Sequence, residues 1–385
     1  MLKNYFAYLP SEQGSVENEW EQCLEQIVQN LSPGCKLLKI NVFADLPGFS
    51  SLLEFRSKIR KSIIDSFGDQ CPAFNITINP PEKPWKVSVE AVSVKSGSIE
   101  VSYKFFKSIP YIIINSPSVK ELWAGGVSSF LYPDDTKKSA EEAFNLMVDL
   151  LAEEKMSLND LVRQWNYIGD ILNVQEGVQN YQIFNEVRNE YYHRCRNIPG
   201  YPAATAIGMK HGGVILDFCS LKSEGIVKTI PVNNPDQVNA YEYDQQVLKG
   251  IEGTGKMMKH PPQFERALLL TSVNSSILYI SGTASILGQE TIGHNDIKAQ
   301  TIVTLKNINK LTDKERISQI TGYGKLSSFD YISLRVYVKN QKDFPVVRSI
   351  CKEYFPTVPT SFIEADICRD DLLVEIEAEL LIKDK

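Results

Sequence analysis

Histidine is scarce in this chain of 385 residues, which contains only His193, His211, His260 and His294. No two of these histidines have the spacing of a helical turn, and the sequence contains neither an HExxH motif nor a CxxC pair. These absences exclude the common structural zinc sites and give no support to a two-histidine, one-carboxylate iron site. We therefore expect no bound metal and no cofactor.

Long apolar runs and an excess of basic residues are also missing. The longest apolar runs include Tyr111–Ile114 and Ala267–Leu270, far short of the roughly 18 residues that a membrane-spanning helix needs. The first residues carry acidic and polar side chains in place of the apolar core of a secretory signal. The net charge is −6 at pH 7, and the seven cysteines fit reduced thiols. We expect a cytoplasmic protein that acts on a small molecule, with no nucleic-acid or membrane partner.

The chain does contain an internal repeat, which decides its predicted fold. In the last copy, apolar periodicity and strand-like alternation predict, in order, a strand at Ile277–Ser281, a helix at Ile297–Leu311, a strand at Ile332–Val338, a helix at Asp343–Phe355 and strands at Ser361–Ile367 and Leu373–Leu380. The middle of the chain has the same order, and FNEVRNEYY there aligns with FPVVRSICKEYF in the last copy. A helix at Ala140–Glu154, with Ser139 as its N-cap, belongs to this middle copy.

A fainter copy occupies the N-terminal part, where helices at Trp20–Leu31 and Ser51–Phe67 are followed by a PxF motif and VSVEA. Units that alternate strands and helices in this way predict an α+β fold with the helices on one face of each sheet. We expect a degenerate unit at 1–96, a second unit at 97–222 and a third at 266–385, with their sheets buried around a pseudo-threefold axis. The segment 223–265 is expected to be a connection that covers a site.

The repeated unit resembles the reactive-intermediate deaminase family (Rid, or YjgF-like), whose fold is chorismate-mutase-like. The resemblance rests on ISGTASI at 280–286, on the helix at 343–355 and on PTSF followed by VEIEA at 359–378. Members of that family are homotrimers with sites at the subunit interfaces. The resemblance therefore implies tandem units in a pseudo-trimeric arrangement, so that the chain is a monomer or a weak oligomer.

Beyond about residue 110, the chain is similar to the chorismatases, a subgroup that cleaves the enolpyruvyl ether of chorismate. The similarity rests on RQWNY at 163–167, YQIFNEVR at 181–188, YPAATAIG at 201–208, FERA at 264–267, ISGTASILGQETIGHND at 280–296 and ADICRDDLLVEIEAE at 365–379. It implies a cofactor-independent enzyme of secondary metabolism that releases pyruvate. Related chains have also been labelled pteridine-dependent dioxygenase-like, a label for which the histidines offer no metal site.

Glu375 is the leading candidate for catalysis. It alternates with Glu377 and Glu379 on the last predicted strand, so the three carboxylates share one face. From the residues alone, this face is either solvated or buried beside a site. The resemblance to chorismatases implies that Glu375 is the general acid, because protonating the enol-ether methylene carbon needs a carboxyl group that keeps its proton at neutral pH.

Cys368 precedes Glu375 by seven residues. Taken alone, it is either a small buried thiol or part of the site. In the resembling family, the subgroup with cysteine at this position tends to form 3-hydroxybenzoate. The subgroup with a smaller residue tends to form a dihydroxycyclohexadiene carboxylate. The resemblance therefore implies 3-hydroxybenzoate as the ring product.

Substrate-binding residues are expected among the arginines, since chorismate carries two carboxylates and planar guanidinium groups bind carboxylates with two hydrogen bonds. The candidates are Arg266, Arg163 and Arg188, of which Arg188 is equally consistent with a surface charge on an amphipathic helix. The backbone around Ser281 and Gly282 is expected to supply close N–H contacts, although Gly282 is also consistent with a simple turn.

Two other functions remain open at this level. A Rid-type deaminase acting on enamines or imines would need the arginine that follows the proline of its first closing strand. Here Thr360, Ala203 and Ala73 occupy that position in the three copies. A non-catalytic protein that binds a small aromatic acid is the second alternative.

Overall fold

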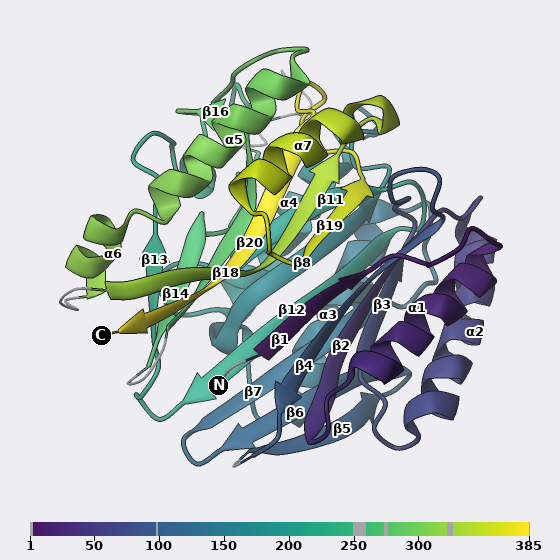
Figure 1. Ribbon diagram of the computed structural model, residues 1–385. Coiled ribbons are helices and arrows are strands. Elements are labelled where there is room, and N and C mark those ends of the chain that lie inside the picture. Colours follow the sequence, from purple (N-terminus) through teal and green to yellow (C-terminus); the bar gives the residue numbers. More distant parts are fainter. Residues whose placement is uncertain (1–2, 98, 249–258, 273–275, 322–325, 385) are drawn as a thin grey trace.

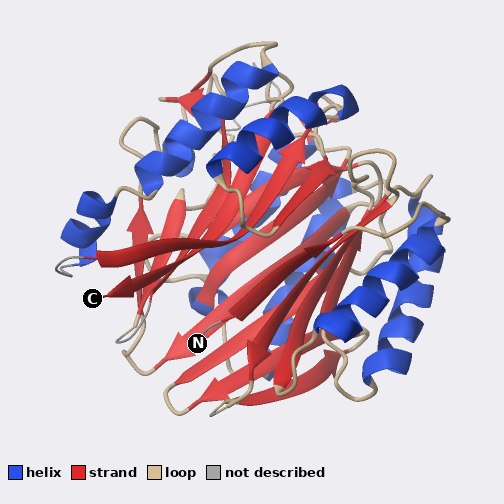
Figure 2. Cartoon of the chain, in the orientation of Figure 1, coloured by secondary structure: helices blue, strands red, loops and turns tan. Residues whose placement is uncertain are grey.

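The computed structural model describes residues 3–97, 99–248, 259–272, 276–321 and 326–384. Within them, three main sheets occupy the interior of the molecule and the long helices lie on its outside (Figure 2). This arrangement confirms the predicted α+β class, because each sheet has helices on its outer face while its inner face meets the other sheets.

The N-terminal sheet has four strands in the order β1-β4-β2-β3. Its elements are β1 (Lys3–Tyr8), α1 (Val16–Asn30), β2 (Cys35–Ala44), α2 (Phe49–Phe67), β3 (Ala73–Thr77) and β4 (Val87–Lys95). Helix α1 begins where Ser15 accepts a hydrogen bond from the Asn18 amide, and it buries Trp20, Leu24 and Ile27. The faint N-terminal copy of the repeat therefore contains all the elements of a βαβαββ unit.

The second sheet has six strands in the order β11-β8-β12-β7-β6-β5. A hairpin of β5 (Glu100–Phe106) and β6 (Ile109–Ser116), which the sequence reading missed, extends it at one edge. The other elements are β7 (Val119–Val127), α3 (Thr136–Glu153), β8 (Leu161–Gly169), α4 (Asn180–Cys195), β11 (Ala203–Met209) and β12 (Val214–Ser223). Short segments β9 (Val174–Gln175) and β10 (Val178–Gln179) pair with each other before α4.

The third sheet also has six strands, in the order β13-β14-β15-β20-β18-β19. Its elements are β13 (Lys228–Val232), β14 (Ala267–Thr271), β15 (Ser276–Ala284), α5 (Ile297–Leu311), α6 (Lys314–Thr321), β18 (Leu326–Val338), α7 (Phe344–Tyr354), β19 (Thr360–Glu364) and β20 (Val374–Asp384). A two-stranded ribbon of β16 (Ile286–Leu287) and β17 (Glu290–Thr291) lies between β15 and α5. Figure 1 shows α5 and α7 together on the outside of this sheet.

The three sheets share one core topology. Each unit places its first strand beside its last strand, then its second strand and then its third, as in β1-β4-β2-β3, β7-β12-β8-β11 and β15-β20-β18-β19. The second and third strands are parallel in every unit, whereas the last strand is antiparallel to both of its neighbours. The pseudo-threefold axis and the unit boundaries stay predictions.

Two details of the sequence reading are wrong. Ser139 is not an N-cap, because α3 begins at Thr136 and Asp135 accepts the hydrogen bond from the Lys138 amide. The Ser139 hydroxyl instead accepts a hydrogen bond from the Val214 amide at 2.8 Å. The segment 223–265 is also more than a connection, since β13 pairs with β14 at the edge of the third sheet.

No described helix is both long and apolar enough to cross a membrane. Among the same residues, no group of three or more His, Cys, Asp or Glu side chains is arranged to hold a metal ion.

Candidate active site

A cavity of about 770 Å³, including its opening to solvent, lies where the second and third sheets meet. Strand β11 and helix α4 form one side, and β15, β20 and the loop before β20 form the other. The two sheets are joined here by hydrogen bonds from the Ala204 amide to Ser281 Oγ at 2.9 Å and from the Gly282 amide to Thr205 Oγ1 at 3.0 Å. Tyr243 of the segment 223–265 also lines the cavity. That segment therefore contributes to the cavity wall.

Glu375 lies in the wall of this cavity, near the start of β20. Its side chain is 5% exposed, so the reading of a solvated strand face is wrong. Burial, with a smaller contribution from the negative charge of Glu377, raises the pKa of Glu375 to about 8 against the opposing pull of Arg266 and Arg163. At neutral pH this carboxyl group therefore keeps its proton.

Gly282 makes room for the Glu375 carboxyl group. A Cβ atom at residue 282 would lie 2.0 Å from Glu375 Oε1 and 3.0 Å from Thr205 Cγ2. A side chain at this position would displace the carboxyl group, so the glycine serves a close approach. Its amide N–H is bonded to Thr205 Oγ1, whereas the sequence analysis expected it to face a ligand.

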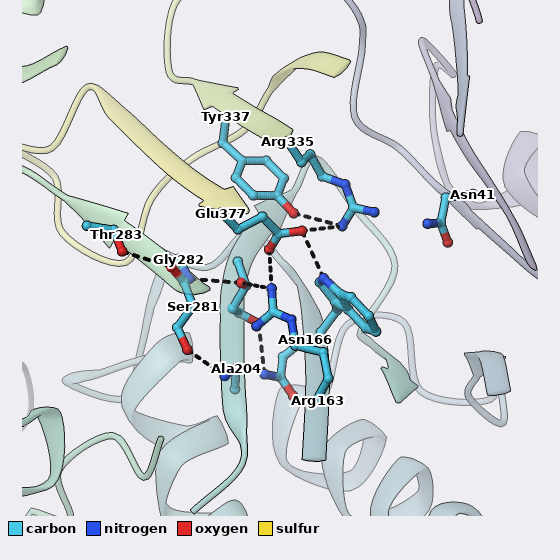
Figure 3. A network of polar contacts seen from close by, with 12 residues as sticks. Asn41, Arg163, Asn166, Ala204, Ser281, Gly282, Thr283, Arg335, Tyr337 and Glu377 are labelled. Atoms are coloured by element: carbon cyan, nitrogen blue, oxygen red, sulfur yellow. Dashed lines mark hydrogen bonds and ion pairs between the residues drawn. The ribbon is translucent and has the colours of Figure 1, made fainter. Parts of the chain in front are cut away.

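Glu377 lies at the centre of a buried ionic network on the next inward position of β20 (Figure 3). Its carboxylate accepts hydrogen bonds from Arg163 Nη2 and Trp165 Nε1, each at 2.8 Å, and forms an ion pair with Arg335 Nη1 at 2.9 Å. Burial alone would raise the pKa of Glu377, but the positive charges of Arg335 and Arg163 lower it. A carboxylate that stays ionised therefore lies two residues from one that stays protonated.

Arg163 and Ser281 support the site and do not line the cavity. Arg163 Nη2 donates both to Glu377 and to Thr205 Oγ1, at 2.8 Å each, which connects the ionic network to the wall beside Gly282. The Ser281 hydroxyl donates to the Glu265 carbonyl at 2.6 Å and is fully buried. The structure thus places both residues behind the cavity wall.

Arg188 and Arg266 do line the cavity. Arg188 is 1% exposed, so it is not a surface charge. Its Nη2 donates to Asn185 Oδ1 at 2.7 Å, while its Nε has no hydrogen-bond partner among the described residues. Arg266 donates to the Tyr243 hydroxyl at 2.6 Å and to the Val238 carbonyl at 2.7 Å, and its buried Nε is likewise unpartnered within the described part.

Arg369 is a third cavity arginine, which sequence reasoning did not single out. Its guanidinium lies 5.2 Å from the centre of the Tyr243 ring, and its Nη1 donates to the Gln289 carbonyl at 2.7 Å. The feature of the sequence that could have indicated Arg369 is its position directly after Cys368, in the run CRDD. Tyr243 was also missed, because nothing in the sequence of its segment indicates that it reaches the third sheet.

These three arginines share one property. In the part of the chain that the structure describes, Arg188, Arg266 and Arg369 form no ion pair with a carboxylate, and each has a buried N–H without a hydrogen-bond partner. A buried cation without a counter-ion is costly. The cavity is therefore suited to a ligand that brings negative charge.

Cys368 also lines the cavity. Burial, together with a smaller contribution from Glu375, raises the pKa of its thiol to about 12. The thiol therefore stays neutral and is not a nucleophile at physiological pH. It acts as a small, weakly polar part of the wall. Together, the cavity residues offer one protonated carboxyl group and several carboxylate-binding donors between apolar walls.

The chain is similar in sequence and in fold to known proteins. A family model described as "Chorismatase FkbO/Hyg5-like, N-terminal" matches residues 119–220. A 3-hydroxybenzoate synthase of Streptomyces hygroscopicus is 33% identical over 255 residues, which cover 63% of this chain and 69% of that protein. A chorismatase of Streptomyces rapamycinicus is 33% identical over 225 residues, covering 56% of this chain and 63% of that protein.

One solved structure is similar over nearly the whole chain. A crystal structure of a chorismatase matches with a TM-score of 0.66 and 21% identity, and the match covers 98% of each chain. At this identity the likeness establishes the fold. The sequence matches span between 60% and 69% of the lengths of three curated relatives.

Proposed function

The chain belongs to the FkbO/Hyg5-like chorismatase family and is an enzyme of that family, and from this premise we propose its reaction. It cleaves the enolpyruvyl ether of chorismate to pyruvate and 3-hydroxybenzoate, with Glu375 as the general acid. The observation that carries this proposal is a buried carboxyl group with a pKa of about 8 in a cavity that also holds three arginines without ion-pair partners among the described residues.

Arginine side chains hold the substrate. Chorismate carries one carboxylate on its ring and one on its enolpyruvyl group, and Arg188, Arg266 and Arg369 provide more than enough donors for both. Their buried N–H groups lose no internal hydrogen bond when a carboxylate binds. Apolar cavity residues, among them Leu248, Phe264 and Leu372, pack against the ring.

Protonation of the enol ether is the first chemical step. Glu375 delivers its proton to the terminal methylene carbon, which becomes the methyl group of pyruvate, and the electron pair of the double bond forms the new C–H bond. The ether carbon becomes an oxocarbenium ion, whose positive charge the newly formed Glu375 carboxylate stabilises. Because the acid holds its proton at neutral pH, the step needs no external acid.

Loss of pyruvate completes the reaction. The neighbouring ring hydroxyl attacks the ring carbon that carries the ether, the carbon–oxygen bond breaks, and the ether oxygen leaves as the keto oxygen of pyruvate. The hydroxyl proton returns to Glu375. The resulting epoxide-like intermediate has the composition of 3-hydroxybenzoate and rearranges to it, so no water is consumed. Attack by water at this stage would give the dihydroxycyclohexadiene carboxylate.

The direct test is an incubation of purified protein with chorismate, with no added metal or cofactor. Pyruvate is followed with lactate dehydrogenase and NADH, and the ring product is identified by chromatography. Wild-type protein should release pyruvate and 3-hydroxybenzoate in equal amounts. Glu375→Gln, which matches the protonated acid in shape, should lose about 10²–10⁴-fold in rate. Unchanged pyruvate release by that variant would disprove the role of Glu375.

A further inference from the structure

A second cavity lies between the third sheet and the N-terminal sheet, and it has no part in the reaction proposed above. It has about 620 Å³ including its opening and is lined by residues of β1, β4, β19 and α7. Strand register shows that it corresponds to the candidate active site. Each sheet contains a row of three paired residues. The row starts at an acidic residue on the last strand of the unit, continues to its partner on the second strand and ends at that residue's partner on the third strand. The three rows are Glu90–Asn41–Asn75, Asp217–Trp165–Thr205 and Glu377–Arg335–Ser361.

These rows show which residues of the second cavity are equivalent to residues of the candidate active site. Ser361 of the second cavity occupies the position of Thr205. Ser88 lies two residues before Glu90, just as Glu375 lies two residues before Glu377, so a serine replaces the catalytic acid. The second cavity therefore cannot repeat the proton transfer.

The second cavity keeps an arginine at the position of Arg188. Phe344–Arg348 at the start of α7 reads FPVVR, and Phe184–Arg188 in α4 reads FNEVR, which places Arg348 at the position of Arg188. Arg348 lines the second cavity and its guanidinium lies 5.6 Å from the centre of the Phe362 ring. Its side chain is 35% exposed.

Glu82 takes the place of Cys368. Pro81 forms a bridge with Ile363 in the same way as Ile367 does with Ile207, so the residues that follow, Glu82 and Cys368, correspond. Two equivalent backbone hydrogen bonds, each of 2.7 Å, support this correspondence. The Glu364 amide donates to the Pro80 carbonyl, and the Gly208 amide donates to the Asp366 carbonyl. Glu82 forms an ion pair with Arg348 at the edge of the cavity.

We propose that this second cavity binds the zwitterion of an α-amino acid with an aromatic side chain. Arg348 binds the carboxylate and Glu82 binds the ammonium group, so each charge of the pair meets its opposite in the ligand. The Ser361 hydroxyl is 2% exposed and has no hydrogen-bond partner among the described residues, and it lines the cavity as a further donor to the carboxylate. Tyr8, Trp85 and Phe362 supply the aromatic wall.

Isothermal titration of the full chain with three matched compounds tests the charges of the ligand. L-Phenylalanine carries both charges, phenethylamine lacks the carboxylate and 3-phenylpropionate lacks the ammonium group. L-Phenylalanine should bind at one site per chain, and each analogue should bind about tenfold or more weakly. Absence of heat with L-phenylalanine at millimolar concentration, or equal affinity for 3-phenylpropionate, would overturn the proposal.

Single substitutions in the two cavities show which of them binds L-phenylalanine. Arg348→Met and Glu82→Gln should each weaken L-phenylalanine at least about tenfold. The matched control is Arg188→Met, which removes the corresponding arginine from the candidate active site and should leave the affinity unchanged. Thermal melts establish that the variants are folded. Weaker binding in Arg188→Met, with unchanged binding in Arg348→Met, would place the ligand in the other cavity and refute the assignment, whatever the result with chorismate.

Discussion

The Glu375 carboxyl group packs directly against the backbone of Gly282, with its Oε1 atom only 2.0 Å from the point that a Cβ atom of residue 282 would occupy. The two residues lie on neighbouring strands, β20 and β15, at a point where the register shifts between Ile280 and Thr283. The irregular backbone and the missing side chain together create the space in which a buried acid fits.

Gly282→Ala should therefore damage catalysis more than stability. The added methyl group meets the flexible end of the Glu375 side chain, so the carboxyl group moves and the strands stay paired. A displacement of about 1 Å can cost roughly 10²-fold in rate, and we expect kcat for pyruvate release to fall by about that factor. Gly48→Ala is the matched control, because a Cβ atom at Gly48 meets nothing within 4 Å. Equal kcat values for the two variants would contradict this account.

The charge of Glu377 should set the pH range of the enzyme. The general acid must be protonated, so the wild-type kcat/KM should be constant at neutral pH and fall above a pKa of about 8. Glu377→Gln removes the negative charge that raises the Glu375 pKa and leaves Arg163 and Arg335 without that partner. Both effects lower the pKa of Glu375. The alkaline limb of the kcat/KM profile should move to lower pH by on the order of one unit.

Glu90→Gln is the control for this shift. Glu90 also pairs with Arg335 and has a similarly buried side chain, 11% exposed against 8% for Glu377, but it lies in the N-terminal sheet. Its loss should cost stability and leave the alkaline limb in place. If both variants shift the profile equally, or neither does, Glu377 has only a structural role.

The repeat and most of its elements could be predicted from local sequence. Helix α5 has the predicted bounds, Ile297–Leu311, because its apolar spacing and the Asp296 cap are both local signals. The hairpin β5–β6 was missed because it lies outside the repeat. Burial of the strand face that carries Glu375 and Glu379 was left open, since only the packing of one sheet against the others decides it.

The candidate site was predictable in part, for the same reason. Glu375, Cys368, Arg266, Arg188 and Gly282 come together around one cavity as a set. Arg163 was expected to contact a ligand, but it is bonded to Glu377, a carboxylate 214 positions away. No property of the RQWNY sequence reveals that partner. Tyr243 and Arg369 reach the cavity through loop conformations that have no periodic signal.

The protonated state of Glu375 should appear in stability as well as in rate. Its pKa is raised in the folded chain, so the folded state keeps a proton that the unfolded state releases between pH 4.5 and about 8. Wild-type stability should fall over this range, relative to Glu375→Gln, by about 1.4 kcal/mol for each pH unit. Urea denaturation at pH 5, 6, 7 and 8 measures the difference, which should be smallest at pH 5 and grow steadily as the pH rises. The exposed Glu21→Gln is the control, and a pH-independent difference for Glu375→Gln would show that its carboxyl group is ionised throughout.

Cys368 should control which nucleophile completes the reaction. The neutral thiol fills space in the wall beside Glu375, and Cys368→Ala leaves room there for water. Water attack on the activated ether gives the dihydroxycyclohexadiene carboxylate, so this variant should release pyruvate while the ring product shifts away from 3-hydroxybenzoate. Chromatography of the ring products at equal pyruvate yield measures the ratio.

Cys351→Ala is the matched control for this change. Cys351 is an equally uncharged thiol, with a pKa also raised to about 12 by burial, but it lies on α7 in the core of the third unit. Its replacement should cost stability through a small cavity and leave the product ratio unchanged. If Cys368→Ala keeps the wild-type ratio, water is excluded by other cavity residues. If both variants shift the ratio, the cause is a general loosening of the fold and not the wall beside Glu375.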